Sequence, residues 1–440
     1  MSGQYALRLW GRNITPAYDK ASWYWALFIA SYFFLLGFPR LFTLPAAVLL
    51  LLGIYQSIVL LRRHGFRGLP RSYHLFLLLF LALWLPLLFS LTDAKYLSDA
   101  ASDTVKILVY GFVGVATVWL AREKRVLPPL VFVLTMLALF WTADVIFQRL
   151  AGFDVFGVVY SLEGEARAGA YFKNPAKFGT YLACMDVLAL FYLLPRLRRP
   201  VPMLALWLFM LLGMVFSMSR TGWAIFMLFS LPLLMRETLR TMRHAWVWAL
   251  GLLLLSVPAF FYYYQHDPVL QQRMARSLAI MDGMTYENWN TVLTYRLDLW
   301  RAALQMFCEH WLNGQGLHAF TEDFHLYAAA PFWQGVQPSH EHQYLLQVMT
   351  ATGVLGLAGL LVLHGLLFRS WRRPGMEAAA LPVAMYLLAM WFPLGSHFSF
   401  YSSEWVWANL LLLGLLAGAL TNNPAELSSV QAQIESRKSS

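Results

Sequence analysis

The stretch HQYLLQVMTATGVLGLAGLLVLHGLLF, residues 342–368, contains no aspartate, glutamate, lysine or arginine. A helix of about 20 apolar residues crosses the hydrocarbon core of a bilayer, so this stretch predicts a membrane-spanning helix. His340 and Glu341 stand directly before it, and His342 is its first residue. We therefore expect a polar, histidine-containing site where this span meets a membrane surface.

Similar apolar stretches recur along the whole chain. The mean hydropathy is +0.54, and only 13% of the residues are charged, which excludes an ordinary soluble domain. The stretches lie at 22–38, 41–61, 73–92, 104–121, 127–149, 176–195, 201–218, 221–236, 245–264, 342–368, 378–396 and 404–420. The sequence thus predicts an all-α integral membrane protein with about 12 transmembrane helices.

The charge distribution orients these spans. Arginine is concentrated in five alternate connections, RRHGFRGLPR, REKR, RLRR, RETLRTMRH and RSWRRPG. Cytoplasmic connections carry such an excess of Lys and Arg, so we expect both termini in the cytoplasm. The same placement accounts for the net charge of +10, and membrane lipid rather than nucleic acid is the expected partner.

Four regions follow from this topology. They are residues 1–264 with nine spans and short loops, 265–341 as a long outward loop, 342–421 with the last three spans, and 422–440 as a flexible cytoplasmic tail. The loop is expected to be partly helical, because its apolar residues recur at helical spacing. The expected apolar face consists of Leu297, Trp300, Leu304 and Phe307.

Arg220 is the first candidate site residue. It follows Ser219 in SMSRTGW (217–223), where Ser219 is expected to cap the eighth span. An arginine at the positive N-terminal end of a helix strengthens an anion site and holds phosphate oxygens in bidentate fashion. The alternative is an arginine that extends toward lipid headgroups.

A second group of cations stands in EARAGAYFKNPAKFGTYL (165–182). Asn174 is expected to be the N-cap of the sixth span, with Arg167, Lys173 and Lys177 nearby. Three cations beside a helix start favour an anion, although Asn-Pro is also a general signal for the start of a helix.

Arg296 begins the helix expected in the long loop, with Arg301 further along it. Both residues are candidates for contact with an anionic substrate. A salt bridge involving the neighbouring Asp298 is the structural alternative for Arg296.

His340 and His342 are separated by one residue. This is not the i, i+4 spacing of a metal-binding histidine pair on a helix, and further ligands are lacking, so we expect no metal. Histidine transfers protons near neutral pH, and a base facing several arginines suggests glycosyl or phosphoryl transfer. An ordinary interfacial histidine is the alternative.

Four motifs resemble, in the same order, those of the O-antigen ligase and polymerase superfamily. HQYLLQVMTATGVLGL (342–357) resembles its His-x-x-x-Leu-Gln and Gly-x-x-Gly signature, SMSRTGW its Ser-Arg-Thr-Gly element, YRLDLWRAALQMFCEHWLNGQGLHAF (295–320) its Arg-led loop helix with a Gly-x-Gly turn, and RAGAYFKNPAKFGTYL (167–182) its Gly-x-Phe-x-Asn-Pro element. Two positions depart from the pattern. Gln343 replaces the frequent Asn, and HWLNGQG lacks the usual Pro-Leu before the turn.

The resemblance implies a GT-C-like, metal-independent, inverting glycosyltransferase that needs no cofactor, located in the bacterial inner membrane with a periplasmic active site. The implied donor is a glycan linked to undecaprenyl diphosphate, and the implied acceptor is a lipid A-core sugar. The expected roles are His342 as base, Arg220 and Arg296 as diphosphate ligands, His340 as alternative base or orienting partner, and Arg167, Lys173, Asn174 and Arg301 as further substrate-binding residues.

Other functions remain open at this point. An O-antigen polymerase or a protein O-oligosaccharyltransferase would share the same motifs. A transporter or flippase would place ionisable residues deep in the spans, where the sequence offers chiefly Asp144 and Asp186. Asp186 has no role in the proposed transfer. A scaffolding protein would leave the placement of the arginines and histidines unexplained.

Overall fold

The computed structural model describes residues 8–9, 12–13, 19–38, 40–159, 167–241, 254, 257–258, 260–328, 333, 335–371, 379–393 and 398–421. The short strands β1 (Arg8–Leu9) and β2 (Arg12–Asn13) pair antiparallel. The helices are α1 (Lys20–Leu35), α2 (Thr43–His64), α3 (Arg71–Ser90), α4 (Leu97–Glu123), α5 (Leu127–Ala151), α6 (Pro175–Leu193), η1 (Leu194–Arg196), α7 (Pro200–Phe216), α8 (Arg220–Thr241), α10 (Pro268–Leu278), η2 (Ala279–Asp282), α11 (Tyr286–Val292), α12 (Arg296–Glu309), α13 (Ala319–Tyr327), α14 (Tyr344–Trp371), α15 (Ala380–Met390) and α16 (Ser403–Leu420).

Eight of these helices are long and apolar enough to cross a membrane, namely α2 to α5, α6 with η1, α8, α14 and α16. The helices α7 and α15 are apolar but shorter. α15 ends at Met390 rather than continuing to 396, because Pro393 follows and cannot donate a backbone hydrogen bond. The predicted span 245–264 and the tail 422–440 lie largely or wholly outside the described residues. The prediction of an all-α integral membrane protein is confirmed.

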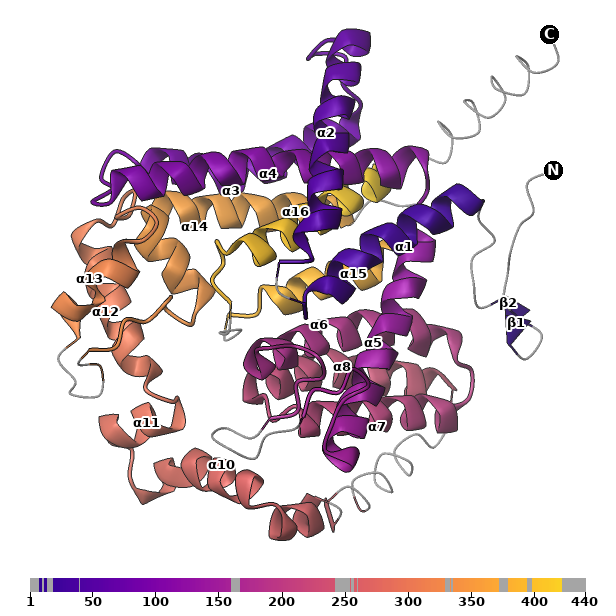
Figure 1. The fold of residues 1–440 in the computed structure, drawn as a ribbon, viewed down its shortest axis with the longest axis vertical. Helices are drawn as coiled ribbons and strands as arrows, with labels where there is room; N and C mark the ends of the chain where they lie inside the picture. The colour runs from indigo at the N-terminus through magenta and orange to yellow at the C-terminus, as the bar shows by residue number, and fades with distance from the viewer. Residues whose placement is uncertain are drawn as a thin grey trace.

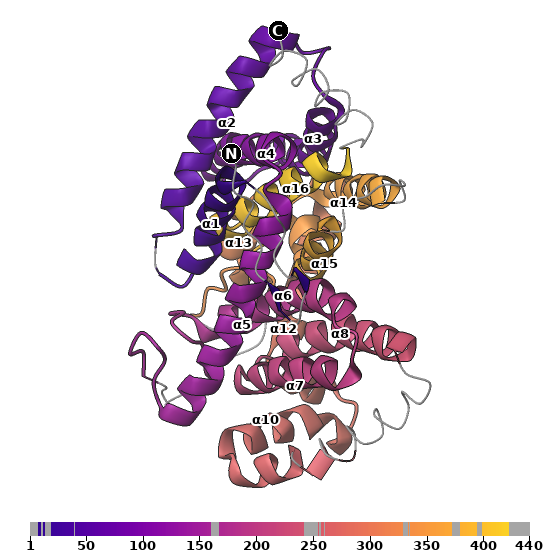
Figure 2. The ribbon, with the colours of Figure 1, turned by 90° about the vertical axis from the view of Figure 1, so that its right-hand side faces the viewer.

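The long helices pack in two groups. In Figure 1, α3, α4, α14 and α16 run beside one another, and α2 crosses over α4. This crossing depends on Gly53, where an added Cβ would lie 1.8 Å from the carbonyl oxygen of Phe112. The second group contains α5 to α8, and the side view in Figure 2 places α10 below α7.

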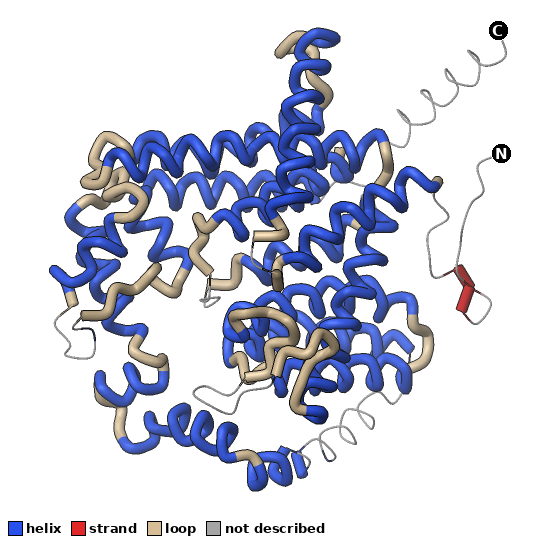
Figure 3. Tube along the Cα trace, in the orientation of Figure 1, coloured by secondary structure: helices blue, strands red, loops and turns tan. Residues whose placement is uncertain are grey.

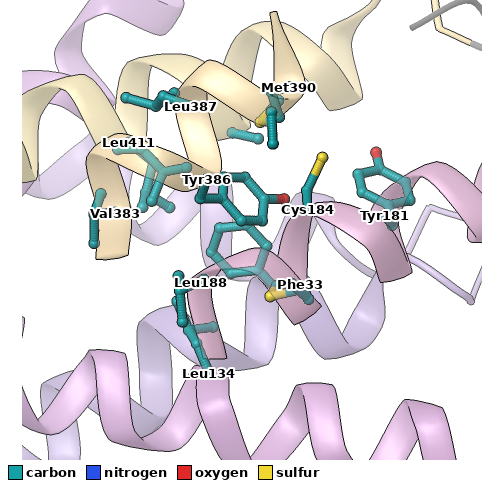
Figure 4. Close-up of a cluster of buried hydrophobic side chains, with 14 of the residues drawn as sticks. Phe33, Leu134, Tyr181, Cys184, Leu188, Val383, Tyr386, Leu387, Met390 and Leu411 are labelled. Carbon is teal, nitrogen blue, oxygen red and sulfur yellow. The ribbon is translucent and has the colours of Figure 1, made fainter. Parts of the chain in front are cut away.

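A buried cluster joins the two groups (Figure 4). Phe33 of α1, Cys184 of α6, Tyr386 of α15 and Leu411 of α16 all belong to it, and each is at most 1% exposed. Close packing of this kind holds helices together in a bilayer, where both the lipid tails and the protein core are apolar.

Connections that the sequence places outside the cell meet at one end of the bundle. Nζ of Lys95 lies 2.7 Å from Oδ1 of Asp323 in α13. Gln347 Nε2, near the start of α14, donates a 2.6 Å hydrogen bond to Oγ of Ser399. These loops lie beside α12, α13 and the start of α14 in Figure 3. Residues of several predicted outward connections are therefore in direct contact.

The loop helix α12 buries a face that matches the predicted one only in part. Its buried residues are Leu299, Ala302, Ala303 and Met306, which pack with α13, whereas Leu304 is 45% exposed. The alanines contribute little to an apolar pattern, but their small side chains allow a neighbouring helix to approach closely. The sequence pattern gave weight to the larger residues, of which Trp300 packs partly buried against this cluster, and it missed the two alanines.

The helix α14 is interrupted at Gly353, which has φ 62° and ψ −154°. The turn that follows α12 fits into this break. Val354 N–H donates to the carbonyl of Trp311 at 2.8 Å, and Gln315 N–H donates to the carbonyl of Thr350 at 2.9 Å. Backbone groups released by the break are thus paired with the long loop, as burial requires.

Gly353→Ala is expected to lower the free energy of unfolding by on the order of 3 kcal/mol. The added Cβ would lie 2.4 Å from the carbonyl oxygen of Leu312, in a backbone conformation that disfavours any Cβ. Gly365→Ala in the same helix is the matched control, because its added Cβ meets no atom within 4 Å. Thermal denaturation followed by fluorescence-detected gel filtration measures both. Equal midpoints for the two variants would contradict the prediction.

Candidate functional site

His340, Glu341 and His342 form a compact turn directly before α14. The ring centroids of His340 and His342 are 4.1 Å apart. His342 has a φ of 53°, which is uncommon for a residue with a Cβ and often marks a functional position. His340 is 8% exposed and Glu341 2% exposed, whereas His342 is half-buried. Of the two histidines, His342 is therefore the more accessible.

Glu341 has a buried carboxyl group. Its Oε1 accepts a 2.5 Å hydrogen bond from the hydroxyl of Thr350. Its Oε2 is buried and has no hydrogen-bond partner within the described part of the chain. Burial raises the pKa of Glu341 to about 7, although the Thr350 hydrogen bond opposes this effect.

Glu341→Gln is expected to stabilise the protein at pH 8 and to change its stability little at pH 5. The pKa in the folded state, about 7, exceeds the ordinary 4.5. The stability that the carboxyl contributes is therefore complete below pH 4.5 and is lost as the pH rises through 7. The full loss is roughly 3 kcal/mol, and an uncharged glutamine avoids it. Thermal midpoints of both proteins at the two pH values test this, and parallel pH dependences would contradict it.

A cavity of about 190 Å³ lies beside this turn. It is lined by Asp103, Gly316, Leu317, His318, Phe320, Thr321, Ser339, His340, Glu341, Gln347, Thr350, Ala351, Ser399, Tyr401 and Ser402. Nε2 of His318 is 2.9 Å from Oδ2 of Asp103. Burial raises the pKa of Tyr401, and the negative charge of Glu341 raises it further. The lining is therefore predominantly polar and comes from four parts of the chain.

Arg220 begins α8 and is half-buried. Ser219 Oγ accepts a hydrogen bond from Gly222 N–H at 3.1 Å, so Ser219 caps the helix as predicted. Nη1 of Arg220 donates to the carbonyl of Val292 at 2.7 Å, and Nη2 donates to Oγ1 of Thr294 at 2.5 Å. The guanidinium therefore holds the segment that leads directly into α12.

Arg296 is the first residue of α12, two positions after Thr294. It is half-buried, whereas Arg301 is exposed. Asp298 accepts hydrogen bonds from Tyr286, Asn290 and Trp333 at 2.6, 2.8 and 3.1 Å. Asp298 thus fixes the start of α12 against its neighbours.

The remaining predicted substrate-binding residues lie at the start of α6 or before it. Asn174 is the N-cap, and its Oδ1 accepts hydrogen bonds from two first-turn N–H groups at 3.0 and 3.2 Å. Lys173 is exposed and Arg167 is half-buried. Nζ of Lys177 pairs with Oε2 of Glu404, in the first turn of α16, at 3.0 Å. The side-chain oxygen of Asn174 therefore has a structural role.

The structure gathers the predicted residues into two sets. One set is Arg220 with the segment leading to Arg296, and the other is His340 with His342. Sequence reasoning missed the cavity, including Asp103 and His318. The acidic connection TDAKYLSDAASD (92–103) gave a weak signal for Asp103, but no local motif pairs it with His318.

The two carboxyl groups within the spans differ in their surroundings. Asp144 Oδ1 accepts a 2.9 Å hydrogen bond from Val155 N–H in the loop after α5, which gives it a structural role. Asp186 is fully buried in α6, and Thr142 Oγ1 donates to its Oδ1 at 3.2 Å. Within the described chain, no three His, Cys, Asp or Glu residues are grouped to hold a metal ion.

Residues 205–361 match the family model described as O-antigen ligase. The matched region contains Arg220, Arg296, Arg301, His340 and His342, and it ends within α14. The residues at the start of α6 precede it. No curated protein matches the chain.

Proposed function

We propose that this chain, whose residues 205–361 match the family model described as O-antigen ligase, is an O-antigen ligase. It transfers a glycan from undecaprenyl diphosphate to a hydroxyl of a lipid A-core sugar. The reaction takes place at the periplasmic face of the bacterial inner membrane, where both substrates are anchored by lipid tails. The observation that carries this proposal is the contact of Arg220 with the segment preceding Arg296, directly within the matched family region.

The transfer is a single displacement with inversion. The acceptor oxygen attacks the anomeric carbon while His342 accepts the hydroxyl proton. The bond between the anomeric carbon and the diphosphate oxygen breaks, and undecaprenyl diphosphate leaves with the electron pair. His340, whose ring lies 4.1 Å from that of His342, orients the base or holds the transferred proton.

Arginines stabilise the leaving group. A diphosphate gains negative charge as the bond breaks, and planar guanidinium groups bind its oxygens in bidentate fashion. Arg220 and Arg296 have this role, and both lie at helix starts, where backbone N–H groups also favour anions. Arg167, Lys173 and Arg301 contribute weaker contacts to the diphosphate or the glycan.

A reconstituted reaction tests the proposal. Purified protein is supplied with a lipid-linked glycan donor and, separately, with lipid A-core, a lipid-linked glycan or a pilin as acceptor. Glycan transfer to lipid A-core supports a ligase. Transfer only to the second lipid-linked glycan would indicate a polymerase, and transfer only to pilin a protein O-oligosaccharyltransferase. Flipping of a fluorescent donor in liposomes without any transfer would favour a transporter.

A further inference from the structure

We propose that the cavity beside His340 binds an uncharged sugar residue of the acceptor, separately from the arginines that hold the donor diphosphate. The inference rests on the proposed glycosyl transfer and specifies the chemical class of the acceptor. It is drawn from the lining of the cavity, its charge, its size and its position next to the proposed base.

The cavity wall contains buried polar side chains, and two of its buried oxygen atoms have no hydrogen-bond partner among the described residues. His340, Glu341, Gln347 and Thr350 line the cavity and are each at most 9% exposed. Burying polar groups away from water costs free energy unless they are hydrogen-bonded. Oε2 of Glu341 and Oγ of Ser402 are buried without a hydrogen-bond partner among the described residues. Sugar hydroxyl groups both donate and accept, so a sugar satisfies such a wall.

The charge of the lining selects against anionic sugars. The carboxylate of Asp103 is already paired with Nζ of Lys106 at 2.6 Å and Nε2 of His318 at 2.9 Å. No lysine or arginine is among the described residues that line the cavity. A phosphate or carboxylate placed there would lose water in a partly desolvated site and would meet no lysine or arginine to compensate. The arginines proposed to hold the diphosphate, Arg220 and Arg296, lie at the starts of α8 and α12 and do not line the cavity. The proposed acceptor cavity therefore lacks the arginines that are proposed to hold the donor diphosphate.

The size and position of the cavity suit one sugar ring. A volume of about 190 Å³ is more than ten times the roughly 10–15 Å³ that holds one water molecule on the same measure. His340 lines the cavity, and its ring centroid is 4.1 Å from that of His342. A hydroxyl of a sugar bound against His340 would therefore lie near the proposed base.

The test compares Asp103→Asn with Asp99→Asn. Both remove one carboxylate charge from α4, but Asp99 is exposed and does not line the cavity. Thr321→Val removes a cavity hydroxyl without changing charge. Asp103→Asn is expected to raise the acceptor KM about tenfold or more while the donor KM and kcat change little, because one hydrogen bond to a charged group is lost. Thr321→Val should raise the acceptor KM less, and Asp99→Asn should not change it.

A binding measurement on the full chain separates this inference from the proposed function. Saturation-transfer NMR with methyl α-D-glucopyranoside should show binding that Asp103→Asn and Thr321→Val weaken, whereas glucose 6-phosphate should bind much less. Equal or tighter binding of the phosphate, or unchanged acceptor KM in both cavity variants that retain the wild-type gel-filtration profile, would overturn the inference while leaving glycan transfer intact. If wild-type protein transferred no glycan to any acceptor, the proposed function would fail, whatever the NMR result.

Discussion

Replacing His342 with alanine is expected to lower kcat for glycan transfer by a factor of about 10² to 10⁴. The imidazole is the proposed acceptor of the hydroxyl proton, and it is the more accessible histidine of the turn before α14. Without a base, the acceptor attacks as a neutral alcohol, which is a poor nucleophile. Initial rates with a lipid-linked donor and lipid A-core measure the effect. Donor binding should change little, since the arginines are retained.

Two histidine variants serve as comparisons for this prediction. His325 lies on an exposed face of α13, and His325→Ala should retain the wild-type rate. His340→Ala should lower the rate less than His342→Ala, because His340 acts through its neighbour. A folded His342→Ala protein with wild-type activity would contradict the assignment. A larger loss for His340→Ala would make His340 the base.

Arg220→Ala is expected to lower kcat about a hundredfold or more, because preorganised donors to a leaving group contribute on that scale. Arg220→Lys should recover only part of this loss, since an ammonium group cannot hold two oxygens in the planar arrangement of a guanidinium. Transfer kinetics of the three proteins, each with a wild-type gel-filtration profile, measure the effect.

The contacts of Arg220 with Val292 and Thr294 require a control for a structural role. Thr294→Val removes one of these contacts but keeps the guanidinium, and it should reduce kcat less than about tenfold. If Thr294→Val were as inactive as Arg220→Ala, the arginine would act mainly by holding the loop. Wild-type kinetics for a folded Arg220→Ala protein would remove Arg220 from the reaction altogether.

Much of the fold follows from patterns that are local in sequence. Apolar length gives the spans, and the caps at Ser219 and Asn174 follow from the residue types that precede each helix. The break in α14 does not, because Gly353 lies within a continuous apolar run and its backbone partners are about 40 residues earlier. The buried face of α12 was predicted only in part, because two small alanines contribute to it.

The candidate site also contains some residues that local motifs predict and others that only the packing of distant segments brings together. Arg220, Arg296 and His342 were identified from short motifs, since each stands at a helix start with a recognisable pattern. The cavity could not be predicted, because Asp103 of α4, His318 and Tyr401 come together only when three distant segments pack at one end of the bundle. No local motif predicts the contacts of Arg220 with Val292 and Thr294 in the long loop.

The pairing of the turn after α12 with the break in α14 determines which segments can be exchanged between related enzymes. Val354 and Leu355 of α14 take their backbone acceptors from Trp311 and Leu312, so neither segment completes its hydrogen bonding alone. A chimera that imports a foreign loop and joins it just before His342 would separate these partners. A junction after Gly356 takes the long loop, the turn with His340 and His342, and the break at Gly353 from the same parent protein. Such chimeras should insert and fold more often than those joined before His342.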